Sequence, residues 1–177
     1  MSKTQWTIDP AHSEIEFKVR HLLISNVSGR FKTFHASIEN EKDDFTDARI
    51  TFEAETASVS TGNDMRDGHL KSDDFFNAEK YPYIRFVSNN IKKTSDNKYK
   101  IEGDITIRDV TKPIVLDVVY NGQMLDSQKN TKAGFEITGR INRKEFGLKW
   151  NGLTDAGTVM ASDEVDLILN VQMKKVS

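Results

Sequence analysis

The chain has 177 residues and a formal net charge of −2, from 27 acidic and 25 basic side chains that are interspersed. A chain of this length can bury a core without metal or disulfide support, and we interpret residues 1–177 as a single domain. The lack of cysteine excludes disulfides, thiolate metal sites and cysteine nucleophiles. Dispersed charge, without a concentrated basic face, argues against nucleic-acid binding.

Alternation of apolar and polar residues with period two runs through most of the chain. This pattern indicates strands that have one dry and one wet face. In chain order it predicts strands at Gln5–Asp9, Glu14–Arg20, Phe31–Glu39, Ala48–Glu55, Tyr83–Ser88, Tyr99–Arg108, Lys112–Asn121, Phe135–Ile141 and Val165–Lys174. Eight or nine strands separated by turn signals predict an all-β sandwich or barrel.

Two segments break this rhythm. In Asn63–Asn77, Asn63 or Asp64 is suited to cap a short helix. The segment His21–Arg30 lacks alternation, and we expect a helical turn there rather than a strand. Thr94–Asn97 and Asn121-Gly122 have the composition of turns.

Strand length favours a barrel over a sandwich. Several predicted strands reach nine or ten residues, which span roughly 33 Å and leave a barrel height of roughly 25 Å after tilting. The dry face also carries small residues that leave space unless neighbours fill it, namely Ala48, Ala54, Ser88, Gly103 and Gly139. Because eight-stranded barrels can be filled by their own side chains, patterning alone leaves filled and hollow barrels equally probable.

If the barrel is hollow, the inward side of the alternation and the aromatic pair of the irregular insert line its lumen. The candidate ligand-binding residues are Ile15, Phe17, Val19, Phe31, Ile50, Phe52, Phe75, Phe76, Phe86, Ile101, Ile105, Phe135, Ile137, Leu167 and Leu169. Arg66 and His69, in the same insert, are candidate contacts for a polar or phosphorylated head group. The alternative is that Arg66 and Asp67 form a local ion pair that fixes the insert.

We find no catalytic set, and we predict no metal or cofactor. The sequence has no Gly-x-Ser-x-Gly elbow, P-loop or Gly-x-Gly-x-x-Gly motif. Its four histidines, at positions 12, 21, 35 and 69, show no metal-ligand spacing. The segment Asp9–Ser13 is interpreted as a turn whose side chains bond nearby backbone groups, rather than as a catalytic triad.

Nine short motifs, in order along the chain, resemble the YceI-like family. They are Trp6–Ser13, Phe17–Leu22, Gly29–Phe31, Arg66–Leu70, Asp74–Phe76, Tyr81-Pro82, Gly103–Arg108, Thr111–Ile114 and Ile141–Gly147. Each is weak alone, but nine in sequence are specific. The chain departs from the family at Arg108-Asp109, where relatives commonly have glycine.

The resemblance implies a lipocalin-like, eight-stranded antiparallel β-barrel, with one or two short helices in this chain. It also implies binding of an isoprenoid-type lipid, such as a polyprenyl phosphate or a quinone, without enzymatic activity, and a homodimer. The alternatives are a plugged-barrel interaction module and a lipid-modifying enzyme that uses Arg66, Asp67 and His69. No apolar leader or membrane-spanning run is recognisable, so we expect a cytoplasmic protein, or a periplasmic one if a signal peptide was removed.

Overall fold

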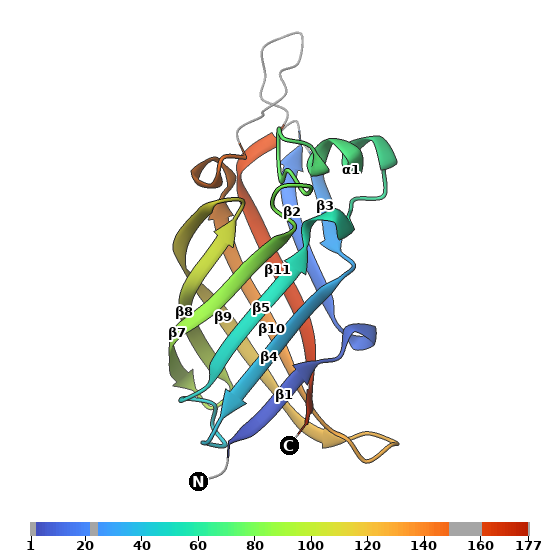
Figure 1. Cartoon of the computed structure of the whole chain (residues 1–177). Helices are drawn as coiled ribbons and strands as arrows, with labels where there is room; N and C mark the ends of the chain where they lie inside the picture. The colour runs from blue at the N-terminus through green and yellow to red at the C-terminus, as the bar shows by residue number, and fades with distance from the viewer. Residues whose placement is uncertain (1–2, 22–24, 149–160, 177) are drawn as a thin grey trace.

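The alternating segments form an antiparallel sheet that closes on itself (Figure 1). The computed structural model describes residues 3–21, 25–148 and 161–176. The strands are β1 (Thr4–Ile8), β2 (Glu14–His21), β3 (Ser25–Phe31), β4 (Phe34–Asn40), β5 (Arg49–Glu55), β6 (Val59–Ser60), β7 (Tyr83–Ser95), β8 (Lys98–Ile107), β9 (Val110–Leu125), β10 (Thr131–Asn142) and β11 (Ala161–Lys175). The helices are α1 (Asp64–Lys71) and the short 3-10 turns η1 (Pro10–His12), η2 (Thr56–Ser58) and η3 (Arg143–Phe146).

Eleven strands make an eight-stranded barrel because three of its positions are each shared by two short strands. Strand β11 pairs with β10 on one side and with both β1 and β2 on the other. Strand β4 joins β1 to β5, while β3 joins β2 to β6. The predicted closed, lipocalin-like antiparallel barrel is therefore confirmed. Both chain ends lie at its lower end in Figure 1, and α1 lies at the upper end.

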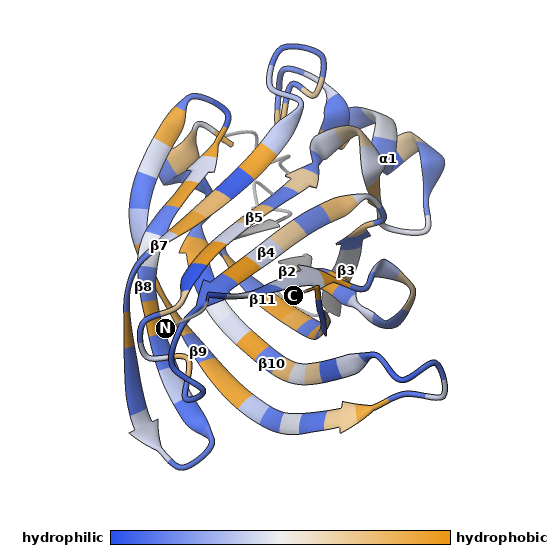
Figure 2. Cartoon of the chain, turned by 60° about the horizontal axis from the view of Figure 1, so that its bottom comes forward, coloured by the Kyte–Doolittle hydropathy of each residue, from blue (hydrophilic) through white to orange (hydrophobic). Residues whose placement is uncertain are grey.

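The alternation places the core as expected. In β8, every second residue from Tyr99 to Ile107 is buried, whereas the residues that alternate with them are more exposed. Figure 2 shows the same change of hydropathy from residue to residue along neighbouring strands. The inward side chains converge on the barrel axis, so the axis is where any binding space has to lie.

Three local predictions from the sequence need correction. The segment His21–Arg30 was expected to be irregular, but His21 belongs to β2 and Ser25–Arg30 to β3, because the two strands pair from Ile15 to His21, while residues 22–24 lie outside the described residues. The predicted strand Phe31–Glu39 is interrupted between β3 and β4. Asn121-Gly122 is no turn but a bulge within β9, where the pairing skips Asn121 and Gly122 has a φ of 102°. The predicted helix is confirmed as α1, which Asn63 caps by accepting a bond from the Arg66 amide.

The junction between β1 and β2 is fastened to the barrel wall by Asp9. Its carboxylate accepts a bond from the Ala11 amide, as the sequence predicted, and also contacts His12 Nδ1 at 2.9 Å. Lys132, on β10, forms an ion pair with the same carboxylate, and both side chains are largely buried. The hydrogen bond from Lys132 is the main cause that lowers the pKa of Asp9 to about 2.

This ion pair predicts an acid-sensitive contribution to stability. Because the folded-state pKa of Asp9 lies below its ordinary value of 3.8, the contribution is complete above about pH 4 and disappears as pH falls towards 2. We expect Asp9→Asn to lower the free energy of unfolding by about 1–2 kcal/mol at pH 7. Denaturant titrations of both proteins between pH 2 and 7 check this. A difference that stays constant over that range would contradict it.

Candidate functional site

The barrel encloses two cavities along its axis. The upper cavity, beside α1, has a volume of about 550 Å³, and the lower cavity has about 130 Å³. Four side chains line both cavities and form a waist between them: Phe52, Ile105, Leu167 and Leu169. The lumen is therefore hollow, which patterning alone had left undecided.

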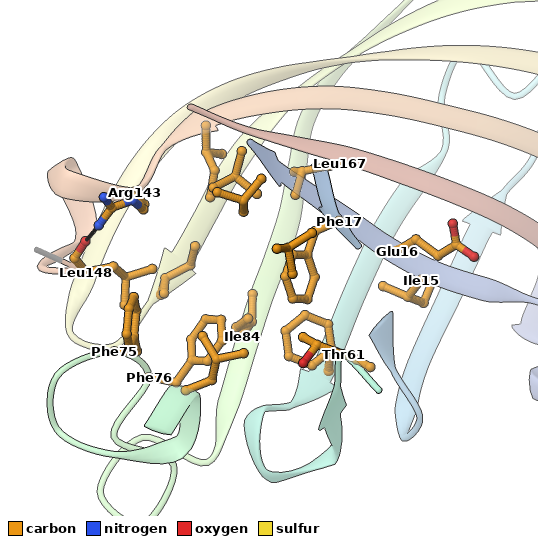
Figure 3. A pocket seen from close by; sticks show the side chains of 18 of the residues that line it. Ile15, Glu16, Phe17, Thr61, Phe75, Phe76, Ile84, Arg143, Leu148 and Leu167 are labelled. Carbon is orange, nitrogen blue, oxygen red and sulfur yellow. Dashed lines mark hydrogen bonds between the residues drawn. The ribbon is translucent and has the colours of Figure 1, made fainter. Parts of the chain in front are cut away.

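The upper cavity is an apolar chamber that reaches the surface at the cap, which we define as residues 61–82. Figure 3 shows Phe17, Phe76 and Ile84 around its interior, while the Glu16 carboxylate points away from them. Met65 of α1 also lines the cavity and is 88% exposed, so the chamber opens beside this helix. Such a chamber suits an apolar molecule that is inserted from the cap end.

Two residues that line the lower cavity, Phe45 and Phe135, belong to an aromatic cluster with Trp6 and Tyr120, which we call the floor. Phe45 contacts the other three rings at centroid distances of 5.5–5.8 Å. Its backbone has a φ of 64°, and its ring is only 5% exposed, so the β4–β5 loop turns inward to place it there. Burial raises the pKa of the nearby Tyr99 hydroxyl, which donates to the Asp44 carbonyl oxygen at 2.8 Å.

The glycines of the dry face do not create this space. A Cβ atom at Gly103 would lie 2.5 Å from the Phe86 ring, and one at Gly139 would lie 2.6 Å from Leu116. Neighbouring side chains therefore fill the room that these glycines leave. Ala54 and Ala48, in contrast, line the upper and lower cavities respectively.

The structure brings all fifteen candidate ligand-binding residues to the lumen. Lining the upper cavity alone are Ile15, Phe17, Val19, Phe31, Phe75 and Phe76, and lining the lower cavity alone are Ile50, Phe86, Ile101, Phe135 and Ile137. The other four form the waist. Contact of these fifteen residues with a ligand stays a prediction.

Arg66 and Asp67 are both anchored on Thr61. Arg66 donates from Nε to Thr61 Oγ1 at 2.8 Å and from Nη2 to the Thr61 carbonyl oxygen at 2.9 Å. Asp67 accepts from the Thr61 amide and hydroxyl, at 2.8 and 2.6 Å. The two side chains thus brace the start of the cap through a shared threonine, and both Arg66 and His69 line the upper cavity. His69 Nε2 lies 2.8 Å from Asp74 Oδ2.

Arg143 is a lining residue that the sequence analysis missed. It is 3% exposed and donates from Nη1 to the Leu148 carbonyl oxygen at 2.7 Å (Figure 3). Its Nη2 lies 3.9 Å from Asp163 Oδ1. Desolvation lowers its pKa, while the charge of Asp163 opposes that shift. A signal was present, because continuing the alternation of Phe135–Ile141 by two residues puts position 143 on the dry face.

Arg108 fastens the cap to the rim of the barrel. It has a φ of 56° and occupies the β8–β9 turn together with Asp109, the pair at which the sequence departs from the family pattern. Its guanidinium donates to the carbonyl oxygens of Asp73 and Phe75, at 2.8 and 3.0 Å, and forms an ion pair with the Asp73 carboxylate. It also lies over the Tyr81 ring, 5.5 Å from the centroid. These contacts hold Phe75 at the upper cavity.

We expect Arg108→Gly to loosen the cap without unfolding the barrel. Glycine relieves the left-handed backbone strain of about 1 kcal/mol, while the charge-assisted bonds to the cap are lost. Amide hydrogen exchange of residues 72–78 should accelerate about tenfold or more, with global stability changed by less than about 1 kcal/mol. Arg108→Lys is the matched control, since it keeps the charge but loses the planar fork. We call the contacts of Arg108 with Asp73, Phe75 and Tyr81 the Arg108 latch. Unchanged amide exchange in Arg108→Gly would show that this latch is not needed to hold the cap.

Within the described residues, no group of three His, Asp or Glu side chains is placed to hold a metal ion. In that same part of the chain, no helix has the length and apolar character needed to cross a membrane.

Taken together, the closed antiparallel barrel and its apolar, cap-covered lumen define a lipocalin-like protein. The YceI-like domain family matches residues 6–173, and the chain belongs to this family. A UPF0312 protein of Staphylococcus aureus strain USA300 is 34% identical over 163 residues, which is 92% of each chain.

Solved structures agree with this assignment. The YceI protein of Campylobacter jejuni is 34% identical, with a TM-score of 0.75 over 90% of this chain and 91% of its own. BcnA of Burkholderia cenocepacia has a TM-score of 0.81 at 22% identity, covering 93% of this chain and 98% of its own. A polyisoprenoid-binding domain from Saccharophagus degradans has a TM-score of 0.68 at 14% identity, covering 97% and 98%. The last two show the fold alone.

Proposed function

We propose that this protein binds one isoprenoid-type lipid, such as a polyprenyl phosphate or a quinone, in its lumen, and that it acts as a carrier or sequestering protein. The observation that carries the proposal is the apolar chamber of about 550 Å³ that opens beside the cap. The family to which the chain belongs and the polyisoprenoid-binding domain that shares its fold are what suggest an isoprenoid as the apolar ligand.

Affinity comes mainly from the chain rather than from the head group. Burying about 300 Å² of apolar surface contributes roughly 7.5 kcal/mol at about 25 cal/mol per Å². A single hydrogen bond to a head group contributes about 1 kcal/mol. Arg66 and His69 at the mouth are suited to a polar or phosphorylated head group, but with modest selectivity.

Binding without catalysis fits the cap better than the enzyme alternative does. Such an enzyme would need Arg66, Asp67 and His69 to act together on a bound lipid. Instead, the side chains of Arg66 and Asp67 form hydrogen bonds with Thr61, and His69 lies beside Asp74. The plugged-barrel alternative is contradicted by the volume of the lumen. The homodimer stays a prediction that light scattering can check.

Native purification followed by solvent extraction and mass spectrometry tests the proposal. We expect an isoprenoid at about one molecule per chain. Leu167→Gln should abolish its recovery, because a polar group then enters the waist. Ile168→Gln is the matched control, since this next residue lies on the opposite face of β11 and lines neither cavity. Recovery of no isoprenoid, together with no binding of added prenyl alcohols, would refute the function.

A further inference from the structure

The cap is folded largely on itself, and both of its ends are tied to one corner of the barrel. Its start follows β6 directly. Near its end, the Thr56 hydroxyl donates to the Tyr81 carbonyl oxygen at 2.8 Å, and the Thr56 amide donates to the Pro82 carbonyl oxygen at 2.9 Å. In between, the hydrogen-bonded backbone amides of residues 72–81 donate to carbonyl oxygens within residues 69–77.

Side-chain contacts join the second half of the cap to α1. His69 Nε2 lies 2.8 Å from Asp74 Oδ2, and the His69 ring meets the Phe75 ring edge-on, with 5.2 Å between the centroids. The helix and the segment after it therefore form one unit. Phe75 and Phe76 extend from this unit to the upper cavity, so a displacement of the cap moves part of the cavity lining (Figure 3).

An apolar contact and a polar contact cross from the cap to the barrel strands. Phe76 is 8% exposed and packs edge-on against the Phe31 ring of β3, at a centroid distance of 5.7 Å. The polar contact is the Arg108 latch. An apolar ligand can replace the contact between Phe76 and Phe31 as the cap lifts, because apolar burial is non-directional. It cannot replace the hydrogen bonds of Arg108 to backbone carbonyl oxygens.

The Arg108 latch acts at a distance from the ligand. Arg108 lines neither cavity, and its side chain is 18% exposed. An interaction that is equally strong in the empty and in the loaded protein favours neither of them. It can still hold the closed form of the cap in both, and so slow passage in each direction by the same factor.

We propose that the cap is a gate to the lumen and that the Arg108 latch sets how often this gate opens. The latch thereby controls the rates of ligand entry and release and leaves the affinity unchanged. Because α1 carries Met65, which borders the mouth of the chamber, lifting the cap widens that mouth. The inference rests on the proposed function for the identity of the ligand, but any apolar probe has to pass the same gate.

Stopped-flow fluorescence with anilinonaphthalene sulfonate, a probe of apolar surfaces, tests the gate. A 20-carbon prenyl alcohol is measured in parallel by displacement of this probe. For both molecules, we expect Arg108→Gly to raise the association and dissociation rate constants about tenfold, since charge-assisted hydrogen bonds that hold the cap are lost. The dissociation constants should stay within about twofold. Leu167→Gln, at the waist, should weaken probe binding, which verifies that the probe occupies the lumen.

Two further variants separate the gate from a general effect of charge. Arg140→Ala removes an arginine whose ion pairs with Asp166 and Glu164, at 2.7 and 3.2 Å, lie on the barrel wall, so both rates should stay within about twofold. Asp73→Asn removes the ion pair of the latch and keeps its carbonyl bonds. The Asp73 carboxylate is 83% exposed, so the acceleration should be at most about threefold. Thermal unfolding verifies that each variant is folded.

Unchanged rates in Arg108→Gly would overturn the inference, and so would an equal acceleration in Arg140→Ala. A faster release at an unchanged association rate constant would also overturn it, because Arg108 would then support the complex itself. Failure of the proposed function looks different. If the probe exchanges faster in Arg108→Gly but no prenyl alcohol binds, the gate stands and the function fails. If the alcohol binds and its rates ignore the latch, the function stands and the gate fails.

Discussion

Phe45→Ala is expected to lower the free energy of unfolding by about 3–5 kcal/mol, the largest effect of any single truncation in the barrel floor. The ring is 5% exposed and contacts Trp6, Tyr120 and Phe135 at once. Alanine leaves a cavity that these three rigid rings cannot close. The substitution also does not relieve the backbone strain at this position, because alanine, like phenylalanine, has a Cβ that disfavours the left-handed conformation. Urea denaturation monitored by tryptophan fluorescence measures the change.

Phe75→Ala provides the comparison for this prediction. Phe75 is also aromatic and lines the upper cavity, but it lies in the cap and is only partly buried. Its truncation should cost less than half as much. If both substitutions destabilise the protein equally, the floor is not a special element of the fold, and the closed end of the lumen loses its support.

Strands whose pattern is local could be predicted from the sequence. In β8, each residue's face follows from two-residue alternation, because one side meets the lumen and the other meets solvent. β3 shows the opposite case. Its one large apolar residue between Ser25 and Arg30 is Val27, and Gly29 is needed because the Phe17 ring of β2 lies where its Cβ would be. β3 is therefore a strand because it pairs with β2, and its own composition does not indicate one.

The residues that line the lumen could be predicted, because they follow the same two-residue alternation as β8. The shape of the lumen could not be predicted. Alternation shows which side chains point inward, and it says nothing of how the Phe86 ring fills the space beside Gly103. The Arg108 latch joins residues 33–35 positions apart and has no local signature. Asn121-Gly122 has a strong turn signature that the pairing of β9 with β10 overrides.

Phe52→Ala should weaken retention of a prenyl chain more than Arg66→Ala does. Phe52 lines both cavities, so its ring faces a bound chain at the waist, whichever part of the chain lies there. Loss of a buried aromatic contact of about 1.5–3 kcal/mol predicts a tenfold to hundredfold weaker complex. Arg66 offers a head-group contact of about 1 kcal/mol, which predicts less than a tenfold change.

Dissociation constants for a 20-carbon prenyl alcohol and for its monophosphate separate the two contributions. Phe52→Ala should weaken both ligands by the same factor, because the waist contacts only the chain. Arg66→Ala should leave the alcohol nearly unchanged and reduce the preference for the phosphate. Phe52→Leu, which keeps most of the apolar surface, should lie close to wild type. The reverse ranking, with Arg66 dominant for both ligands, would mean that the protein selects head groups and that burial of the chain is secondary.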